Sequence, residues 1–255
     1  VTAVGEGVDD IAVGDRVASF PATSANDHPV YGDVIVLPRT AITRYPNVLT
    51  PIEASVHYTP LLIAYFAYVD LARAKAGQTA LVTDASHCAG PAFVQLGRAL
   101  GLKVFAATKD AAQRDYLLGL GADKVIVTEE QDLLLQIGKY TDGRGVDMVL
   151  DGMGGPQMSL LGDVLAPRGS LVLYGLQGGN QTPFPACAAF KKHLSFFPMS
   201  SSVIAEHDDA LAGFKTGGFS HTYFAGYRTN DGYRDHAAIT KHSLAGKWFY
   251  TGGDD

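Results

Sequence analysis

The stretch TALVTDASHCAGPAFVQLGRALGLKVFAAT, residues 79–108, decides the fold class of this chain. It begins with the apolar run TALVTDA (79–85) and ends with a second apolar run, KVFAAT (103–108). Gly90 and Pro91 open a predicted helix between the two runs. Small and apolar residues then recur at the spacing of one helical face: Phe93, Val94, Gly97 and Leu100. An amphipathic helix between two apolar strands predicts a strand–helix–strand unit whose parallel strands are buried on both faces.

The same alternation of strand and helix continues along the chain. Further strands are predicted at 124–128, 146–151, 170–175 and 194–197. Further helices are predicted at 111–120, around Leu133, Leu134 and Ile137, and at 156–165. With right-handed crossovers, parallel strands in this order form a doubly wound sheet of the Rossmann type. The sequence therefore predicts an α/β fold.

The residues on either side of this unit have a different character. Short alternating runs broken by turn residues predict a small antiparallel unit near the start: VTAVGEGV (1–8), VGDRVASF (13–20) and YGDVIVLP (31–38). A long apolar helix is predicted to begin at Pro51 and to reach Ala74. After Ser201 the alternation stops, and we interpret the rest as a return to the first domain. The predicted domains are 1–51, 52–201 and 202–255.

The composition excludes several classes of protein. The chain of 255 residues is 47% hydrophobic and has a net charge of −6, which excludes a disordered chain and disfavours nucleic acid as a partner. Two cysteines cannot build a disulfide framework, so we expect a reducing compartment, the cytoplasm. The longest apolar run, residues 60–69, is too short to span a bilayer, so no membrane partner is expected.

The turn after the first strand of the Rossmann unit is the candidate phosphate-binding loop. In doubly wound sheets this turn presents backbone amides and the positive end of a helix dipole to a pyrophosphate. Its residues are Ser86, His87, Cys88, Ala89 and Gly90. Only Gly90 matches the glycine fingerprint, at the place where a glycine lets helix and strand pack closely. An ordinary tight turn without a ligand is the alternative interpretation.

The end of the second strand indicates which dinucleotide fits. Lys109 follows Ala106-Ala107-Thr108, nineteen positions after Gly90, where an NAD-specific site usually has a carboxylate. A cation at this position suits a ribose 2′-phosphate, and Arg114 lies one helical turn further on. The sequence thus favours NADP(H), with a solvated surface lysine as the alternative.

Five motifs in order carry a family resemblance: VGEGVDDIAVGDRV, LARAKAGQTALVTDAS, GADKVIVTEE, GRGVDMVLDGMGGPQ and LVLYGLQGGNQTPFP. The chain resembles the medium-chain dehydrogenase/reductase superfamily, most closely its zinc-independent quinone oxidoreductase-like (zeta-crystallin-like) members. The resemblance implies a GroES-like domain beside the Rossmann domain and places Val1 about halfway through that GroES-like domain. It further implies an NADPH-dependent reductase of quinones or α,β-unsaturated carbonyls, working as a homodimer that pairs through the sixth Rossmann strand.

Departures from the family pattern keep two alternatives open. Ile63 stands where the family has a threonine near the nicotinamide, and the loop SHCAG carries larger residues than its relatives do. A non-catalytic dinucleotide-binding or structural protein on this fold is therefore the first alternative. His57 stands where zinc-dependent members have a cysteine ligand, and the four-cysteine loop has no counterpart. We therefore expect no metal, with a zinc alcohol dehydrogenase as the second alternative.

The predicted first helix and the residues from the end of the fifth strand onward contain further candidates for the substrate and cofactor sites. His57 and Tyr65 are eight residues apart on the predicted first helix, so they share a face, and either could donate to an oxygen that gains charge. Core packing is the competing interpretation for both. Tyr174-Gly175 end the fifth strand, where a ligand can approach the backbone. Phe184, like Ile63, is predicted to wall an apolar substrate pocket.

Overall fold

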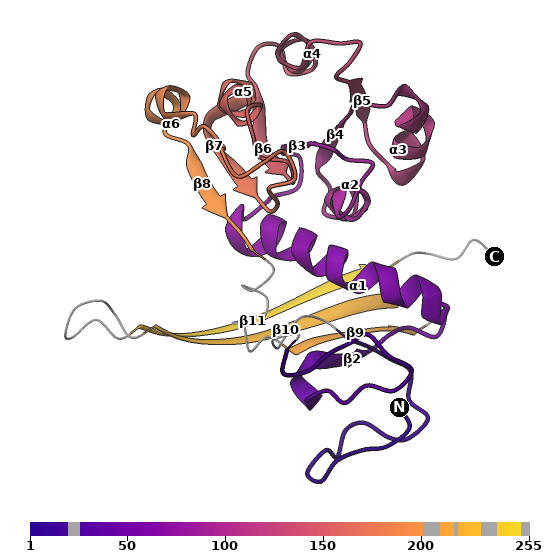
Figure 1. The fold of residues 1–255 in the computed structure, drawn as a ribbon. Helices are drawn as coiled ribbons and strands as arrows, with labels where there is room; N and C mark the ends of the chain where they lie inside the picture. Colours follow the sequence, from indigo (N-terminus) through magenta and orange to yellow (C-terminus); the bar gives the residue numbers. More distant parts are fainter. Residues whose placement is uncertain (20–25, 201–209, 217–218, 231–238, 251–255) are drawn as a thin grey trace. The chain divides into compact units, whose positions relative to one another are not determined.

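The computed structural model describes residues 1–19, 26–200, 210–216, 219–230 and 239–250, and for those after 209 it describes the backbone alone (Figure 1). The chain divides into two compact units. One consists of Val1–Thr59 with Ser202–Asp255, and the other of Pro60–Ser201. Each unit is described by itself below.

The unit Pro60–Ser201 contains a parallel six-stranded sheet in the order β5-β4-β3-β6-β7-β8. The strands are β3 (Thr79–Val82), β4 (Lys103–Thr108), β5 (Lys124–Val127), β6 (Val146–Asp151), β7 (Leu165–Leu173) and β8 (Ser195–Pro198). This is the strand order of the doubly wound dinucleotide-binding sheet, and the predicted α/β fold is confirmed.

Helices cover both faces of this sheet (Figure 1). On one face lie α2 (Gly90–Ala99) and α3 (Arg114–Leu120), the latter preceded by the 3₁₀ turn η3 (Ala111–Gln113). On the other face lie α4 (Leu133–Tyr140), α5 (Met158–Val164) and α6 (Ala186–Lys192). Gly121 ends α3 with a left-handed φ of +107°, as the glycine at the end of that helical pattern predicts.

A continuous apolar core lies between the sheet and the helices α4 and α5. It joins buried side chains of five strands and both helices: Leu81, Phe105, Ala107, Ile126, Ile137, Val146, Val149, Met158, Leu161, Val164, Leu165 and Leu171. Because strands β3, β4 and β6 are covered on both faces, nearly every residue in them is buried. The carboxyl ends of these strands are thereby fixed relative to one another.

The strand β7 differs from its predicted bounds. The sequence predicts a strand from residue 170, but β7 begins at Leu165, directly after α5. Its pairing with β6 shifts register between Val146 and Met148, and Arg168 has a left-handed φ of +63° in this stretch. The irregular pairing extends β7 over residues 165–169, before the predicted start of the strand.

Two of the three strand-like runs predicted near the start of the chain are not strands in the described structure. Within its described residues, β1 (Val17–Ser19) pairs antiparallel with β2 (Ile42–Arg44), while β9 (Ala210–Thr216), β10 (Phe219–Asn230) and β11 (Ile239–Tyr250) form an antiparallel sheet. The runs at 1–8 and 31–38 were expected to be strands, and that expectation is wrong. Gly7 adopts φ +80°, which interrupts an extended chain, and no described strand pairs with residues 31–38.

The helix α1 (Pro51–Tyr65) begins at the predicted residue. Thr50 and Glu53 form a reciprocal cap: the Glu53 amide donates to Thr50 Oγ1 (3.2 Å), and the Thr50 amide donates to Glu53 Oε2 (2.7 Å). The hydrogen bond to the Thr50 amide lowers the pKa of Glu53. The helix does not run regularly to Ala74, because it continues as a π-helix, η2 (Phe66–Leu71).

Among the helices that the structure describes, none combines the length and the apolar character that crossing a bilayer requires.

Candidate functional site

The turn from β3 to α2 brings a helix N-terminus to the carboxyl edge of the sheet. A Cβ atom on Gly90 would lie 2.5 Å from the carbonyl oxygen of Ala85, a distance that a side chain does not tolerate. The first residue of α2 therefore lies directly against the backbone that follows β3. This places the start of the helix where doubly wound sheets receive the phosphates of a ligand.

Backbone amides at the start of α2 are available to a ligand. Ala89 is the N-cap residue of α2, and no side chain caps the helix. Inside the turn, the His87 amide donates to the Asp84 carbonyl (3.0 Å) and the Gly90 amide donates to the His87 carbonyl (2.9 Å). Within the described residues, the amides of Cys88 and Ala89 donate no hydrogen bond. These two N–H groups and the helix dipole favour an anion.

Polar side chains of the turn form a short chain of contacts. His87 Nδ1 lies 3.0 Å from Asp84 Oδ1 and 3.1 Å from Ser86 Oγ. Ser86 Oγ lies 3.1 Å from Thr108 Oγ1, at the end of β4. The turn is thus connected through Ser86 to the neighbouring strand, and its histidine is oriented by a carboxylate.

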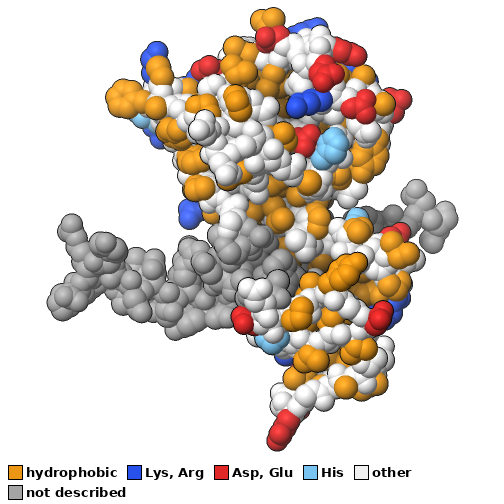
Figure 2. Space-filling view, viewed as in Figure 1, with side chains coloured by type: hydrophobic (Ala, Val, Ile, Leu, Met, Phe, Trp, Pro, Cys, Tyr) orange, Lys and Arg blue, Asp and Glu red, His pale blue; other side chains and the backbone are white. Residues whose placement is uncertain are grey.

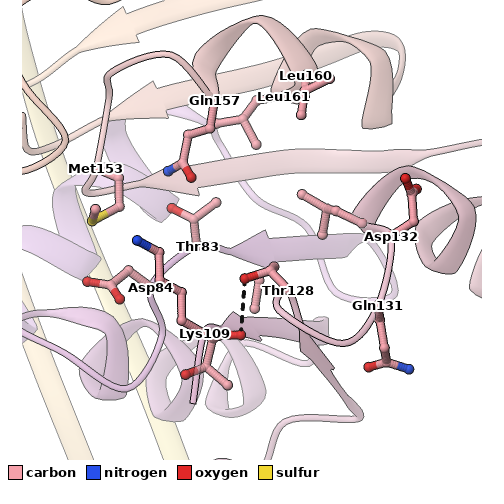
Figure 3. A pocket seen from close by; sticks show the side chains of 13 residues that line it. Thr83, Asp84, Lys109, Thr128, Gln131, Asp132, Met153, Gln157, Leu160 and Leu161 are labelled. Atoms are coloured by element: carbon pink, nitrogen blue, oxygen red, sulfur yellow. Dashed lines mark hydrogen bonds between the residues drawn. The ribbon is translucent and has the colours of Figure 1, made fainter. Parts of the chain in front are cut away.

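A cavity of about 260 Å³ opens beside this turn, at the ends of β3, β4, β5 and β6 (Figure 3). Its polar lining includes Asp84, Lys109, Thr128, Gln131 and Asp132. Its apolar lining includes Leu133, Met153, Leu160 and Leu161. Figure 3 shows Asp84 and Lys109 at one end and Gln131 and Asp132 at the other. A cavity lined by one cation, two carboxylates, hydroxyl groups and an apolar wall can hold a small ligand with both polar and apolar parts.

The two cations predicted to select NADP(H) point to different places. Lys109 lines the cavity. Arg114 instead donates to the Val125 carbonyl (3.3 Å), and its guanidinium lies 3.8 Å from the carboxylate of Glu130. Arg114 is therefore committed to β5 and the residues after it, and it does not line the cavity.

A carboxylate follows Lys109 directly, but its side chain serves the local backbone. Asp110 is the N-cap of η3, and its Oδ1 accepts a hydrogen bond from the Ala112 amide (2.9 Å). Gln113 donates to the other oxygen of the same carboxylate (3.4 Å). Asp110 therefore does not occupy the place of an NAD-selecting acid in the cavity.

Asp151, at the end of β6, is a fully buried carboxyl that sequence reasoning did not single out. It accepts hydrogen bonds from the Thr83 hydroxyl, from the Gly154 amide (2.8 Å) and from the Met153 amide (3.4 Å). Burial raises the pKa of Asp151, against the lowering effect of these donors. It ties β3 to the loop after β6, and so shapes the edge of the cavity near Met153.

Tyr174 and Gly175 lie where β7 ends, as predicted, but the tyrosine side chain is packed. Its ring stacks on Phe93 of α2 with centroids 4.5 Å apart. Burial, with the negative charges of Asp151 and Asp84, raises the pKa of the Tyr174 hydroxyl. A Cβ on Gly175 would collide with the Gly152 carbonyl, so only the glycine backbone fits here.

The loop after β7 also reaches the turn before α2. Gln177 Nε2 donates to Cys88 Sγ at 2.9 Å, across 89 residues of sequence. Cys88 is exposed and has a left-handed φ of +50°. Nothing in the local sequence pattern indicated this contact, because it depends on the relative placement of two strand ends.

The remaining predicted site residues lie elsewhere in the fold. His57 is exposed and Tyr65 is partly buried, and both belong to α1. Ile63 of the same helix is partly buried. Phe184 packs on Phe196 of β8 with ring centroids 5.3 Å apart and is half exposed. None of these four lines the cavity beside Lys109.

In the described ranges, no group of three or more His, Cys, Asp or Glu side chains lies close enough together to bind a metal ion. Cys88 and Cys187 are both exposed free thiols.

Comparison with known proteins gives consistent similarities. Residues 89–212 match the sequence model of a family described as zinc-binding dehydrogenase. A quinone oxidoreductase from Pseudomonas syringae is 25% identical, with a TM-score of 0.71 over 80% of this chain and 62% of its own. A mycobacterial protein solved in complex with NADPH is also 25% identical, with a TM-score of 0.71 over 81% of this chain and 63% of its own.

Curated relatives are much longer proteins. A mycocerosic acid synthase-like polyketide synthase of Mycobacterium tuberculosis is 27% identical over 80% of this chain and 10% of its own length. A squalestatin hexaketide synthase of a Phoma species is 26% identical over 80% of this chain and 8% of its own length. The chain therefore spans about a tenth of the curated relatives that it matches.

Proposed function

From the premise that the chain belongs to the medium-chain dehydrogenase/reductase superfamily, we propose that it is an NADPH-dependent reductase. Its substrate is an apolar quinone or an α,β-unsaturated carbonyl compound. The observation that carries the proposal is the turn from β3 to α2: it contains the amides of Cys88 and Ala89, which donate no hydrogen bond within the described chain, and its Asp84 lines the same cavity as Lys109.

The residues at the strand ends fit an NADP(H) molecule. The N-terminus of α2 provides the amides of Cys88 and Ala89 for the pyrophosphate, and Gly90 lets the helix come close enough. The cavity with Leu160 and Leu161 on its wall takes the adenosine half, with Lys109 beside the 2′-phosphate. Gly175 offers backbone without a side chain at the end of β7.

Held by the amides of Cys88 and Ala89 and by Lys109, NADPH would supply the hydride that reduces an enone or a quinone. A group of the chain would have to stabilise and protonate the substrate oxygen. We assign the donor role to His57 or Tyr65 of α1, since an imidazole or a phenol can donate a hydrogen bond to a developing oxyanion. Ile63 and Phe184 supply apolar surface for the substrate.

Assembly and compartment belong to the same proposal. β8 is an edge of the six-stranded sheet, and its Phe196 and Phe197 are only partly buried. An apolar edge without charged residues favours pairing with a second copy, so we infer a homodimer through β8. The exposed thiols of Cys88 and Cys187 suit the reducing cytoplasm.

Turnover with defined substrates tests the proposal. Purified protein is mixed with NADPH or NADH and with a quinone, a simple enone or an enoyl thioester, and loss of reduced nicotinamide absorbance is followed. The proposal predicts faster oxidation of NADPH than of NADH with at least one of the three substrate classes. Saturable NADPH binding without turnover on any of them would favour a non-catalytic binding protein instead.

A further inference from the structure

Asp84 places a carboxylate in the cavity proposed for the 2′-phosphate. It follows β3, has a left-handed φ of +47°, and lines the same cavity as Lys109 (Figure 3). Its side chain is only 19% exposed. A carboxylate with little access to water repels a phosphate, because solvent screens the charge incompletely.

The other residues that line the cavity do not neutralise the negative charge of Asp84. Of the residues that line it, Lys109 is the one cation, whereas Asp84 and Asp132 are acidic. Asp132 is occupied as the N-cap of α4, where its Oδ1 accepts a hydrogen bond from the Leu135 amide at 2.8 Å. Asp84 also raises the pKa of its neighbours Asp151 and Tyr174, as expected of a negative charge close to both.

His87 is positioned to offset the charge of Asp84. Its Nδ1 lies 3.0 Å from Asp84 Oδ1, three residues back in the turn. The His87 amide donates to the Asp84 carbonyl, and Ser86 Oγ lies 3.1 Å from the same ring nitrogen. Two contacts therefore hold Nδ1, and because an ionised carboxylate only accepts hydrogen bonds, the contact with Asp84 requires that Nδ1 carry the proton. Figure 2 shows acidic (red), basic (blue) and histidine (pale blue) side chains close together on the face that it presents.

We propose that Asp84 and His87 act as one specificity-determining pair, in which His87 masks a carboxylate that otherwise repels the 2′-phosphate of NADPH. The inference rests on the proposed cofactor site. Asp84 and His87 are positioning residues that act through the electrostatic potential around Lys109. Neither needs to touch the cofactor. The pair sets the preference for NADPH over NADH, since only NADPH carries the extra phosphate.

A double-mutant cycle tests this coupling. Dissociation constants for NADPH and NADH are measured by nicotinamide fluorescence for the wild type, His87→Gln, Asp84→Asn and the double variant. Asparagine has the shape of aspartate and still accepts from the imidazole, so the turn is preserved. His87→Gln is expected to weaken NADPH binding about two- to fivefold, with a smaller effect on NADH. In the Asp84→Asn background the same change is expected to have little effect.

A matched control uses the other carboxylate of the cavity. Asp132→Asn combined with His87→Gln is expected to leave the loss of NADPH affinity in place, because Asp132 does not contact His87. Equal losses from His87→Gln with and without Asp84 would overturn the inference and make His87 a direct ligand. Unchanged affinities in all variants would also overturn it. Failure of the wild type to bind either dinucleotide would instead refute the proposed function itself.

Discussion

A Cβ atom at Gly90 would lie 2.5 Å from the carbonyl oxygen of Ala85, so α2 begins in direct contact with the backbone that follows β3. This contact sets the distance between the helix N-terminus and the sheet. Because residue 90 has no side chain, the turn that contains the amides of Cys88 and Ala89 can pack against the backbone that follows β3.

Substitution at Gly90 is therefore expected to disturb both stability and cofactor binding. Gly90→Ala should lower the free energy of unfolding by about 1–3 kcal/mol, because helix and turn must separate. It should also weaken dinucleotide binding. Gly119→Ala in α3 is the matched control, since a Cβ there meets nothing within 4 Å. Alanine at 119 should be neutral or stabilising by up to about 1 kcal/mol. Urea unfolding of both variants measures the difference, and equal effects would contradict the account.

Lys109 is expected to carry the discrimination between the two dinucleotides. Lys109→Ala should weaken NADPH binding at least about tenfold and leave NADH binding nearly unchanged, because one phosphate loses its cation. Arg114→Ala is the control, since Arg114 binds the Val125 carbonyl and lies near Glu130 rather than in the cavity. Fluorescence titrations with both dinucleotides measure the ratio of the dissociation constants for NADH and NADPH in each variant. A larger change for Arg114→Ala than for Lys109→Ala would reverse the assignment.

Asp147 gives the protein a pH-dependent contribution to stability. Burial acts to raise the pKa of Asp147, but hydrogen bonds from Arg144 (2.8 Å) and from the amide (2.8 Å) and hydroxyl of Thr79 outweigh it, so the pKa is lowered. A lowered pKa stabilises the fold above the unfolded value of about 3.9, and this contribution is lost as the pH falls through the folded value. Asp147→Asn should be less stable than wild type at pH about 7.

The difference in free energy of unfolding between the wild type and Asp147→Asn should narrow below pH about 4. There the wild-type carboxylate becomes protonated and loses its charge, so that it resembles the uncharged asparagine. Urea unfolding across this pH range measures it. A gap that stays constant with pH would show that Asp147 acts by packing alone.

Lys192 is expected to stabilise the junction between α5 and β7. Its Nζ donates to the carbonyls of Gly162 (3.2 Å), Asp163 (2.7 Å) and Leu165 (2.7 Å). Lys192→Met keeps the aliphatic stem and removes the charge, so it should lower the free energy of unfolding by about 1–2 kcal/mol. Lys191→Met, at the exposed neighbouring position of α6, should change it little. Similar losses in both variants would contradict this reading.

Continuous apolar runs predicted the strands of the six-stranded sheet closely. The short alternating runs at 1–8 and 31–38 were also predicted to be strands, but they are not. The predicted strands 103–108 and 146–151 have the bounds of β4 and β6, because burial on both faces leaves one unbroken apolar signature. Val34 and Val36 alternate as a strand would, yet they are 77% and 80% exposed. Alternation alone does not specify a partner strand, and no described strand pairs with these residues.

Site residues could be predicted where their place is set by a nearby strand end. Gly90 and Lys109 could be identified by their distance from a strand end, since the Rossmann turn fixes both places. Asp84 and Asp151 could not, because their roles depend on contacts between strand ends that are far apart in the chain. The same holds for Gln177, which contacts Cys88 across 89 residues.

The strand ends around Gly90 and Lys109 are expected to bind NADPH in preference to NADH. A fluorescence titration of the wild-type protein with each reduced dinucleotide measures this preference. Saturable binding of NADPH and clearly weaker binding of NADH are expected. Binding of neither, or tighter binding of NADH, would contradict this expectation.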